Sequence, residues 1–125
     1  MTQKQSETYM YNSEISKIKE INEKYDLTYN NLAAVLDVTP KTLTRWTNKK
    51  QGSMTISEQK IDRLKVLESI LELGKEVLGS DDELNKWLHT PVLALDGKEP
   101  VGLLKTESGR RKVEEALHQI EYGIF

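Results

Sequence analysis

Residues 27–46, LTYNNLAAVLDVTPKTLTRW, contain two helix-start signals with a turn between them. Thr28 is a good N-cap for a short helix. Thr39 followed by Pro40 places a capping hydroxyl before a proline at the first helical position, where the missing N–H costs nothing. Asp37 falls where the chain must turn. The inner face of the first short helix would consist of Leu32, Ala33, Val35 and Leu36.

The residue pattern of the second short helix predicts a surface that binds nucleic acid. Leu43 and Trp46, three residues apart, would lock it onto the first helix, and small Ala33 permits their close approach. The outward side chains are of types that bind base edges and phosphates. A plain helical hairpin is the alternative to a helix-turn-helix unit. The candidate DNA-binding residues are Thr39, Lys41, Thr42, Thr44, Arg45, Lys49 and Lys50.

The distribution of charge is uneven, although the net charge is only −2. Residues 1–56 carry two more basic than acidic side chains, and residues 57–125 carry four more acidic than basic ones. No acid interrupts the cations between Thr39 and Lys50. A basic stripe on an acidic chain is typical of a phosphate contact, but also of a solvated helix end.

Upstream of this unit, residues 1–10 are expected to lack structure. An amphipathic helix is predicted over 11–25, because its apolar residues recur at spacings of three and four. Downstream, Gly52 is the expected stop of the second short helix. The apolar residues of the first helix are Tyr11, Ile15, Ile18, Ile21 and Tyr25.

Residues 57–78 predict one helix, capped by Ser57, whose apolar arc of about 180° is wider than the ~100° of an ordinary surface helix. Lys60 and Arg63 interrupt the arc near its start. One stripe holds Ile61, Leu64, Leu67, Leu71 and Leu78, and a second holds Val66, Ile70, Leu73 and Val77. The second stripe is the candidate dimer seam. Burial of both stripes within one chain is the alternative.

The C-terminal part predicts further helices. Ser80 begins one with three acids in its first turn, where the helix dipole favours them. Residues 90–109 contain Pro91, Gly97, Pro100, Gly102 and Gly109, which predict short turns. Thr106 or Ser108 then caps a last helix, inside which Val113, Ala116, Leu117 and Ile120 recur at helical spacing. Gly123 suits the position just past its end.

Two features of this last segment admit two interpretations each. Ile124 and Phe125, the only phenylalanine, either fold back on the last helix or anchor a partner. Arg110 and Arg111 either bind an anion, which would be a phosphate or a carboxylate of a partner, or lie solvated on the surface.

Several classes of protein are not expected. The chain has no cysteine and no apolar run near the roughly 18 residues of a membrane span. Its first residues do not resemble a signal peptide, so a cytoplasmic location is expected. His89 and His118 lie far apart, and no glycine-rich phosphate loop or catalytic pair is present. We therefore expect no metal, no cofactor and no enzymatic activity.

The skeleton LA..L.V...TL.RW, from Leu32 to Trp46, resembles the Xre-type repressor-like helix-turn-helix family. Asp37 stands where that family usually has glycine. Asp tolerates the left-handed conformation better than most residues, so the turn is expected to survive.

The C-terminal part resembles the toxin-binding domain of the Xre/MbcA/ParS-type antitoxins. The resemblance is carried by WL.TP (87–91), L.G..P...L.T..G (95–109) and V...L..IEYG (113–123). Val92 departs from it, since a polar residue is usual there. The resemblance implies a neighbour-encoded RES-domain toxin that consumes NAD, an antitoxin C-terminus that blocks its cleft, and repression of the operon's own promoter. The toxin-binding residues would be Arg110, Arg111, Glu121, Tyr122, Gly123, Ile124 and Phe125.

The sequence therefore predicts an all-α protein with a tail (1–10), a DNA-binding helix-turn-helix domain (11–56) and a helical dimerisation and toxin-binding domain (57–125). Its function would be that of an antitoxin and autorepressor. Two alternatives stay open: a stand-alone transcriptional regulator that dimerises or senses a ligand, and a protein-binding adaptor that no longer contacts DNA. A homodimer is expected, because two half-sites one DNA turn apart raise affinity.

Overall fold

The computed structural model describes residues 2–48 and 56–123, and the side chains from residue 13 onward within these ranges. This part of the chain is all-α, which confirms the predicted class. None of its helices is long and apolar enough to cross a membrane. The elements are α1 (Thr2–Tyr25), α2 (Tyr29–Leu36), α3 (Pro40–Asn48), α4 (Glu58–Leu78), α5 (Asp81–Leu88), the 3-10 turn η1 (Leu93–Leu95), α6 (Pro100–Leu103) and α7 (Glu107–Glu121).

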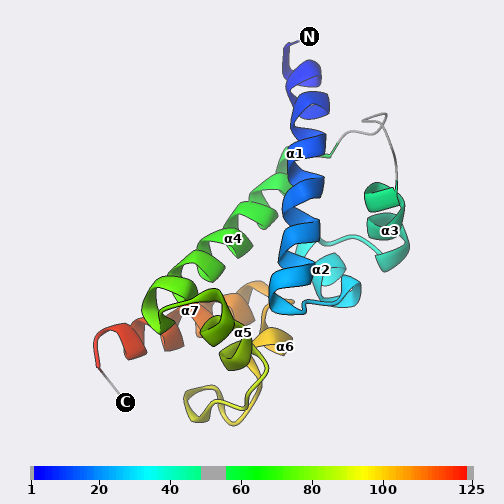
Figure 1. Cartoon of the computed structure of the whole chain (residues 1–125). Helices are drawn as coiled ribbons and strands as arrows, with labels where there is room; N and C mark the ends of the chain where they lie inside the picture. The colour runs from blue at the N-terminus through cyan, green and yellow to red at the C-terminus, as the bar shows by residue number, and fades with distance from the viewer. Residues whose placement is uncertain (1, 49–55, 124–125) are drawn as a thin grey trace.

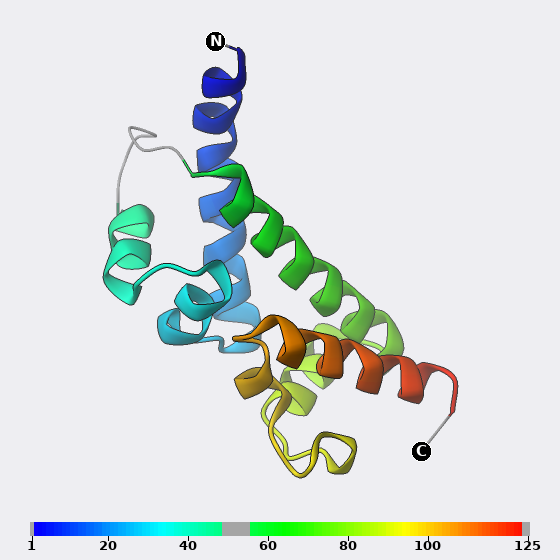
Figure 2. The ribbon, with the colours of Figure 1, turned by 180° about the vertical axis from the view of Figure 1, so that it is seen from behind.

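The helices are arranged around two long ones. Helix α4 starts near the middle of α1 and runs away from it at an angle, while α2 and α3 lie on the other side of α1 (Figure 1). Helices α5 and α7 lie beside the far half of α4, and α6 lies near the C-terminal end of α1 and beside the start of α7, in both views (Figure 2).

The predicted helix starts are confirmed by side-chain caps. The hydroxyl of Thr28 accepts a hydrogen bond from the Asn31 N–H at 3.1 Å. Ser57 and Ser80 cap α4 and α5 in the same way. Of the two candidates for α7, it is Thr106 whose hydroxyl accepts from the Gly109 N–H, at 3.0 Å. Each cap satisfies a donor that the first helical turn leaves without a partner.

Helix α1 differs from the sequence-based expectation at its start. It begins at Thr2, whereas residues 1–10 were expected to lack structure and the helix to begin near Tyr11. Residues 2–10 contain neither proline nor glycine. Extending an existing helix adds one hydrogen bond per residue without a new nucleation cost, which accounts for the longer helix.

The turn between α2 and α3 forms at Asp37, as predicted. Asp37 is in the left-handed conformation with φ 59°, and its N–H bonds the Ala34 carbonyl at 3.3 Å. The Val38 N–H reaches back to the Ala33 carbonyl at 2.9 Å. These bonds close the end of α2 before α3 starts. The predicted stop at Gly52 lies outside the described residues.

One hydrophobic core extends across the predicted domain boundary at residue 56. Helix α4 contacts α1, α2, α5 and α7. Its first predicted stripe is buried from Ile61 to Leu71, in one cluster with Ile18 of α1, Leu36 of α2 and Leu117 of α7. The division into a DNA-binding and a toxin-binding domain thus stays a prediction about function.

A group of polar contacts joins the end of α1 to α5. The Tyr25 hydroxyl donates to the Asp81 carboxylate at 2.5 Å, and Lys24 lies 3.5 Å from the same carboxylate. The hydrogen bond from Tyr25 lowers the pKa of Asp81 below its usual range, and the nearby Lys24 charge acts in the same direction. His89 Nε2 lies 2.8 Å from the Tyr25 carbonyl oxygen. These contacts fix the angle between α1 and α5.

We predict that Asp81→Asn lowers the free energy of unfolding at pH 7 by about 1 kcal/mol more than Asp82→Asn, because only Asp81 accepts a charge-assisted hydrogen bond. Asp82 is an exposed neighbour in the same helical turn and controls for the helix dipole. Because the folded-state pKa of Asp81 is depressed, its contribution is present above the unfolded pKa of about 3.9 and is lost as the pH falls through the folded value.

Urea unfolding of both variants between pH 7 and pH 2.5 measures this. The difference in free energy of unfolding between the two variants should disappear at pH 2.5. Equal destabilisation at pH 7 would show that the Tyr25 bond contributes nothing.

Candidate functional site

The outer face of α3 carries the predicted DNA-binding residues. Lys41, Thr44 and Arg45 are exposed, while Leu43 and Trp46 are buried against the core. This is the division between inner and outer faces that the sequence predicted. Lys49 and Lys50 lie outside the described residues.

Thr39 and Thr42 already bond each other at the start of α3. The Thr39 hydroxyl accepts from the Thr42 N–H at 3.1 Å and lies 3.0 Å from the Thr42 hydroxyl. The Thr39 hydroxyl therefore caps the start of α3, and Thr42 is half-buried. Of the described residues in the predicted set, Lys41, Thr44 and Arg45 are exposed and take no part in this cap.

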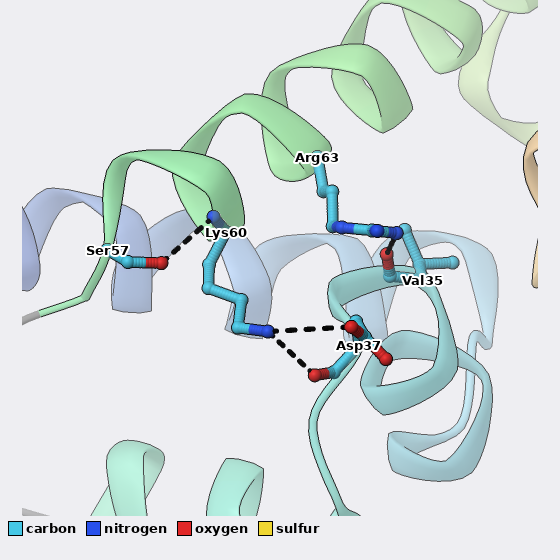
Figure 3. Close-up of polar contacts among 5 residues, drawn as sticks. All are labelled: Val35, Asp37, Ser57, Lys60 and Arg63. Carbon is cyan, nitrogen blue, oxygen red and sulfur yellow. Dashed lines mark hydrogen bonds and ion pairs between the residues drawn. The ribbon is translucent and has the colours of Figure 1, made fainter.

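Two cations of α4 hold the turn that precedes α3 (Figure 3). Lys60 Nζ donates to the Asp37 carbonyl at 2.8 Å and lies 3.8 Å from the Asp37 carboxylate. Arg63 donates to the Val35 carbonyl at 3.5 Å. These carbonyls belong to the end of α2, where intrahelical donors run out. Lys60 and Arg63 are the residues that interrupt the apolar arc of α4 in the sequence, but sequence alone did not show what they bind.

The candidate dimer seam is divided by the fold. Ile70 is only 4% exposed, so its own chain already covers it, whereas Val66 is 48% exposed. Leu73 and Val77 are half-buried. Helix α7 packs against α4 and supplies cover that the sequence could not reveal. Val66 is thus the member of the seam most available to a second copy.

A cleft of about 880 Å³ lies between α2, the first half of α4 and the first half of α7. Arg110 lines it although it is only 7% exposed, and its guanidinium donates to the Leu104 carbonyl at 2.9 Å. Burial lowers the pKa of Arg110, and so does the neighbouring charge of Arg63. Arg111 differs, because it is exposed and pairs with Glu107 at 3.2 Å. The two adjacent arginines therefore lie in different surroundings, one buried and one exposed.

The end of α7 presents the other predicted toxin-binding residues. Tyr122 is 69% exposed, and its ring stacks on His118 with centroids 6.0 Å apart. Glu121 is exposed and lies 3.0 Å from His118 Nδ1. Gly123 has φ 69°, the left-handed conformation predicted for the residue past a helix end. Ile124 and Phe125 lie outside the described residues, so both interpretations of the tail stay open.

One exposed apolar residue was not selected from the sequence. Leu93 is 92% exposed in the segment between α5 and α6, which the Val92–Lys98 bridge closes into a loop. The periodicity of the sequence gave no signal for it, because the segment is not a regular helix. This loop and the C-terminal end of α7 both lie far from the N-terminus of α1 (Figures 1 and 2).

Comparison with known proteins identifies this C-terminal region. Residues 73–123 match the family described as the antitoxin Xre/MbcA/ParS C-terminal toxin-binding domain. The Prs ADP-ribosylating antitoxin of Sphingobium sp. (strain YBL2) is 41% identical over 61 residues, which are 47% of this chain and 38% of that protein. The aligned region thus spans well under half of that relative.

A longer similarity extends over most of the chain. The mycobacterial cidal antitoxin MbcA of Mycobacterium tuberculosis (strain ATCC 25618 / H37Rv) is 24% identical over 103 residues, which are 82% of this chain and 87% of that protein. A chain of the crystal structure of the M. tuberculosis MbcT-MbcA toxin-antitoxin complex has a TM-score of 0.60 and covers 89% of this chain at 24% identity. This structural similarity supports the fold.

The fold and the matched C-terminal region are similar to those of all-α antitoxins of toxin-antitoxin systems. Residues 73–123 are, more particularly, similar to the C-terminal toxin-binding domain of the Xre/MbcA/ParS-type antitoxins.

Proposed function

We propose that this chain is an antitoxin and that it neutralises a RES-domain, NAD-consuming toxin encoded beside it, by placing its C-terminal end in the toxin's active-site cleft. The observation that carries the proposal is the exposed Tyr122 at the end of a helix inside the matched region. The RES-domain partner is what the family resemblance implies. The similarity to a chain of the MbcT-MbcA complex supports a toxin as the partner.

The geometry of α7 supports insertion of the C-terminal end into a partner's cleft. The helix has 15 residues and packs against α4, so it holds its last turn in a fixed position. Tyr122 follows that turn, and Gly123, Ile124 and Phe125 come next in the sequence. Aromatic side chains buried in a partner's pocket contribute roughly 2 kcal/mol or more each. Glu121 and Arg111 are exposed and would make polar contacts around the anchor.

We further propose that α3 binds the operon's own promoter, with the chain acting as an autorepressor dimer. The exposed Lys41, Thr44 and Arg45 support this, since a helix with such an outer face fits the major groove. Lys49 and Lys50 would add phosphate contacts. The alternative is a stand-alone regulator whose C-terminal region dimerises or senses a ligand. Growth arrest on expressing the neighbouring reading frame alone would favour the antitoxin.

Removing Gly123–Phe125 should abolish inhibition of the toxin, because Ile124 and Phe125 of the proposed anchor are lost while α7 keeps its capped start and its packing. NAD loss in mixtures of purified toxin and antitoxin measures this. Tyr122→Ala should give partial loss of inhibition, and circular dichroism should match the full chain in both cases. Full inhibition by the truncated chain would refute insertion of the tail.

Arg45→Ala should weaken operator binding by about 1–3 kcal/mol if Arg45 reads a guanine. Lys49→Ala should chiefly reduce the salt dependence of binding, as expected for a phosphate contact. Lys65→Ala, an exposed cation of α4, is the control for loss of net charge. Fluorescence anisotropy at several salt concentrations measures these effects. Unchanged binding for both Arg45→Ala and Lys49→Ala would favour the adaptor function instead.

A further inference from the structure

The cleft between α2, α4 and α7 contains cations without a carboxylate partner. Lys60 pairs with Asp37 and Arg111 pairs with Glu107, at 3.8 Å and 3.2 Å. In the described part of the chain no other ion pair involves a charged residue that lines the cleft. The residues left are Arg63, Lys105 and Arg110 on the basic side and Asp62 and Glu114 on the acidic side.

Arg63 and Arg110 are two of these cations, and both line the same cleft. Among the described residues, their guanidiniums bond the backbone carbonyls of Val35 and Leu104. Burial lowers the pKa of Arg110, which is only 7% exposed, and the charge of Arg63 acts in the same direction. An anion stabilises a buried guanidinium that lies near a like charge. A negative group in the cleft would therefore be attracted to both arginines.

The remaining surroundings favour a phosphate group over a single carboxylate. Thr106 and Glu107, at the start of α7, line the cleft, so the positive end of a 15-residue helix adjoins the arginines. The unpaired side chains of the cleft carry three positive and two negative charges, an excess of one positive charge to which the helix start adds. Guanidinium forks match the oxygens of a phosphate group. The volume of about 880 Å³ lies in the range of small-molecule sites, and half-exposed Val66 offers an apolar contact.

We propose that this cleft binds the phosphate group of a small molecule, either inorganic phosphate or a nucleoside monophosphate, between Arg63 and Arg110. The site lies on the start of α7, away from the C-terminal end that would enter a toxin. It is independent of toxin neutralisation, and either proposal stands if the other fails.

Titration calorimetry of the full chain with inorganic phosphate and with AMP tests the proposal, at ionic strength held constant with sodium chloride. Saturable binding of at least one of them is expected. Arg63→Gln should weaken it about tenfold or more, the effect of losing one charge-assisted hydrogen bond. Lys65→Gln removes the same charge from α4 outside the cleft and should leave the affinity unchanged. Tighter binding of AMP would identify an organic phosphate as the ligand, and equal or tighter binding of phosphate the free anion.

Lys105→Gln provides a second test if Arg63→Gln unfolds, because Lys105 is exposed and bonds no other described side chain. It should weaken phosphate binding by less than Arg63→Gln does. Absence of saturable binding to both probes would overturn the proposal. Equal affinities in Arg63→Gln, Lys105→Gln and Lys65→Gln would overturn it as well, since binding would then lie elsewhere.

Discussion

The burial of α4 is the interaction on which the rest of the structure depends. Its apolar side chains face α1 and α2 near its start and α5 and α7 near its end. A surface helix needs cover on one side only, but the arc of α4 is about twice that wide, so helices from both ends of the sequence must close over it. Each fully buried leucine or isoleucine contributes roughly 1.5–3 kcal/mol, so the buried side chains of this helix make a large contribution to stability.

This arrangement separates the two proposed binding surfaces while keeping them in one body. The outer face of α3 lies on one side of α1, and the C-terminal end of α7 lies at the far end of α4 (Figure 1). Lys60 and Arg63 bond the end of α2 from α4 itself, so the turn before α3 is held by the helix that also supports α7. The cleft that Arg63 and Arg110 line is formed by the end of α2, α4 and the start of α7.

Local signals in the sequence predicted much of the fold. Thr28, Ser57 and Ser80 each begin a helix as expected, because capping depends on a few adjacent residues. Asp37 adopts the left-handed turn in place of glycine. The predicted start of α1 was wrong. A helix-breaking residue marks a boundary clearly, whereas the absence of proline and glycine from residues 2–10 is a weaker signal that the helix continues.

Features that depend on tertiary packing were not predictable. Arg110 and Arg111 are adjacent and chemically identical, yet one is buried in the cleft and the other is exposed. Ile70 was assigned to the candidate dimer seam, and only the position of α7 shows that its own chain covers it. The apolar pattern of α4 predicted how wide an arc of the helix is apolar, but it did not predict which neighbouring helix covers each section of that arc.

The central claim is that α4 joins the two halves into one cooperative unit, and native-state hydrogen exchange tests it most directly. Ile61→Val removes one buried methylene near α1 and α2 and should cost about 0.5–1.5 kcal/mol. The account predicts that the opening free energy of the Leu117 amide in α7 falls by the same amount as that of the Leu36 amide in α2. An unchanged value at Leu117, with a lower one at Leu36, would show that the two halves unfold separately and would contradict the account.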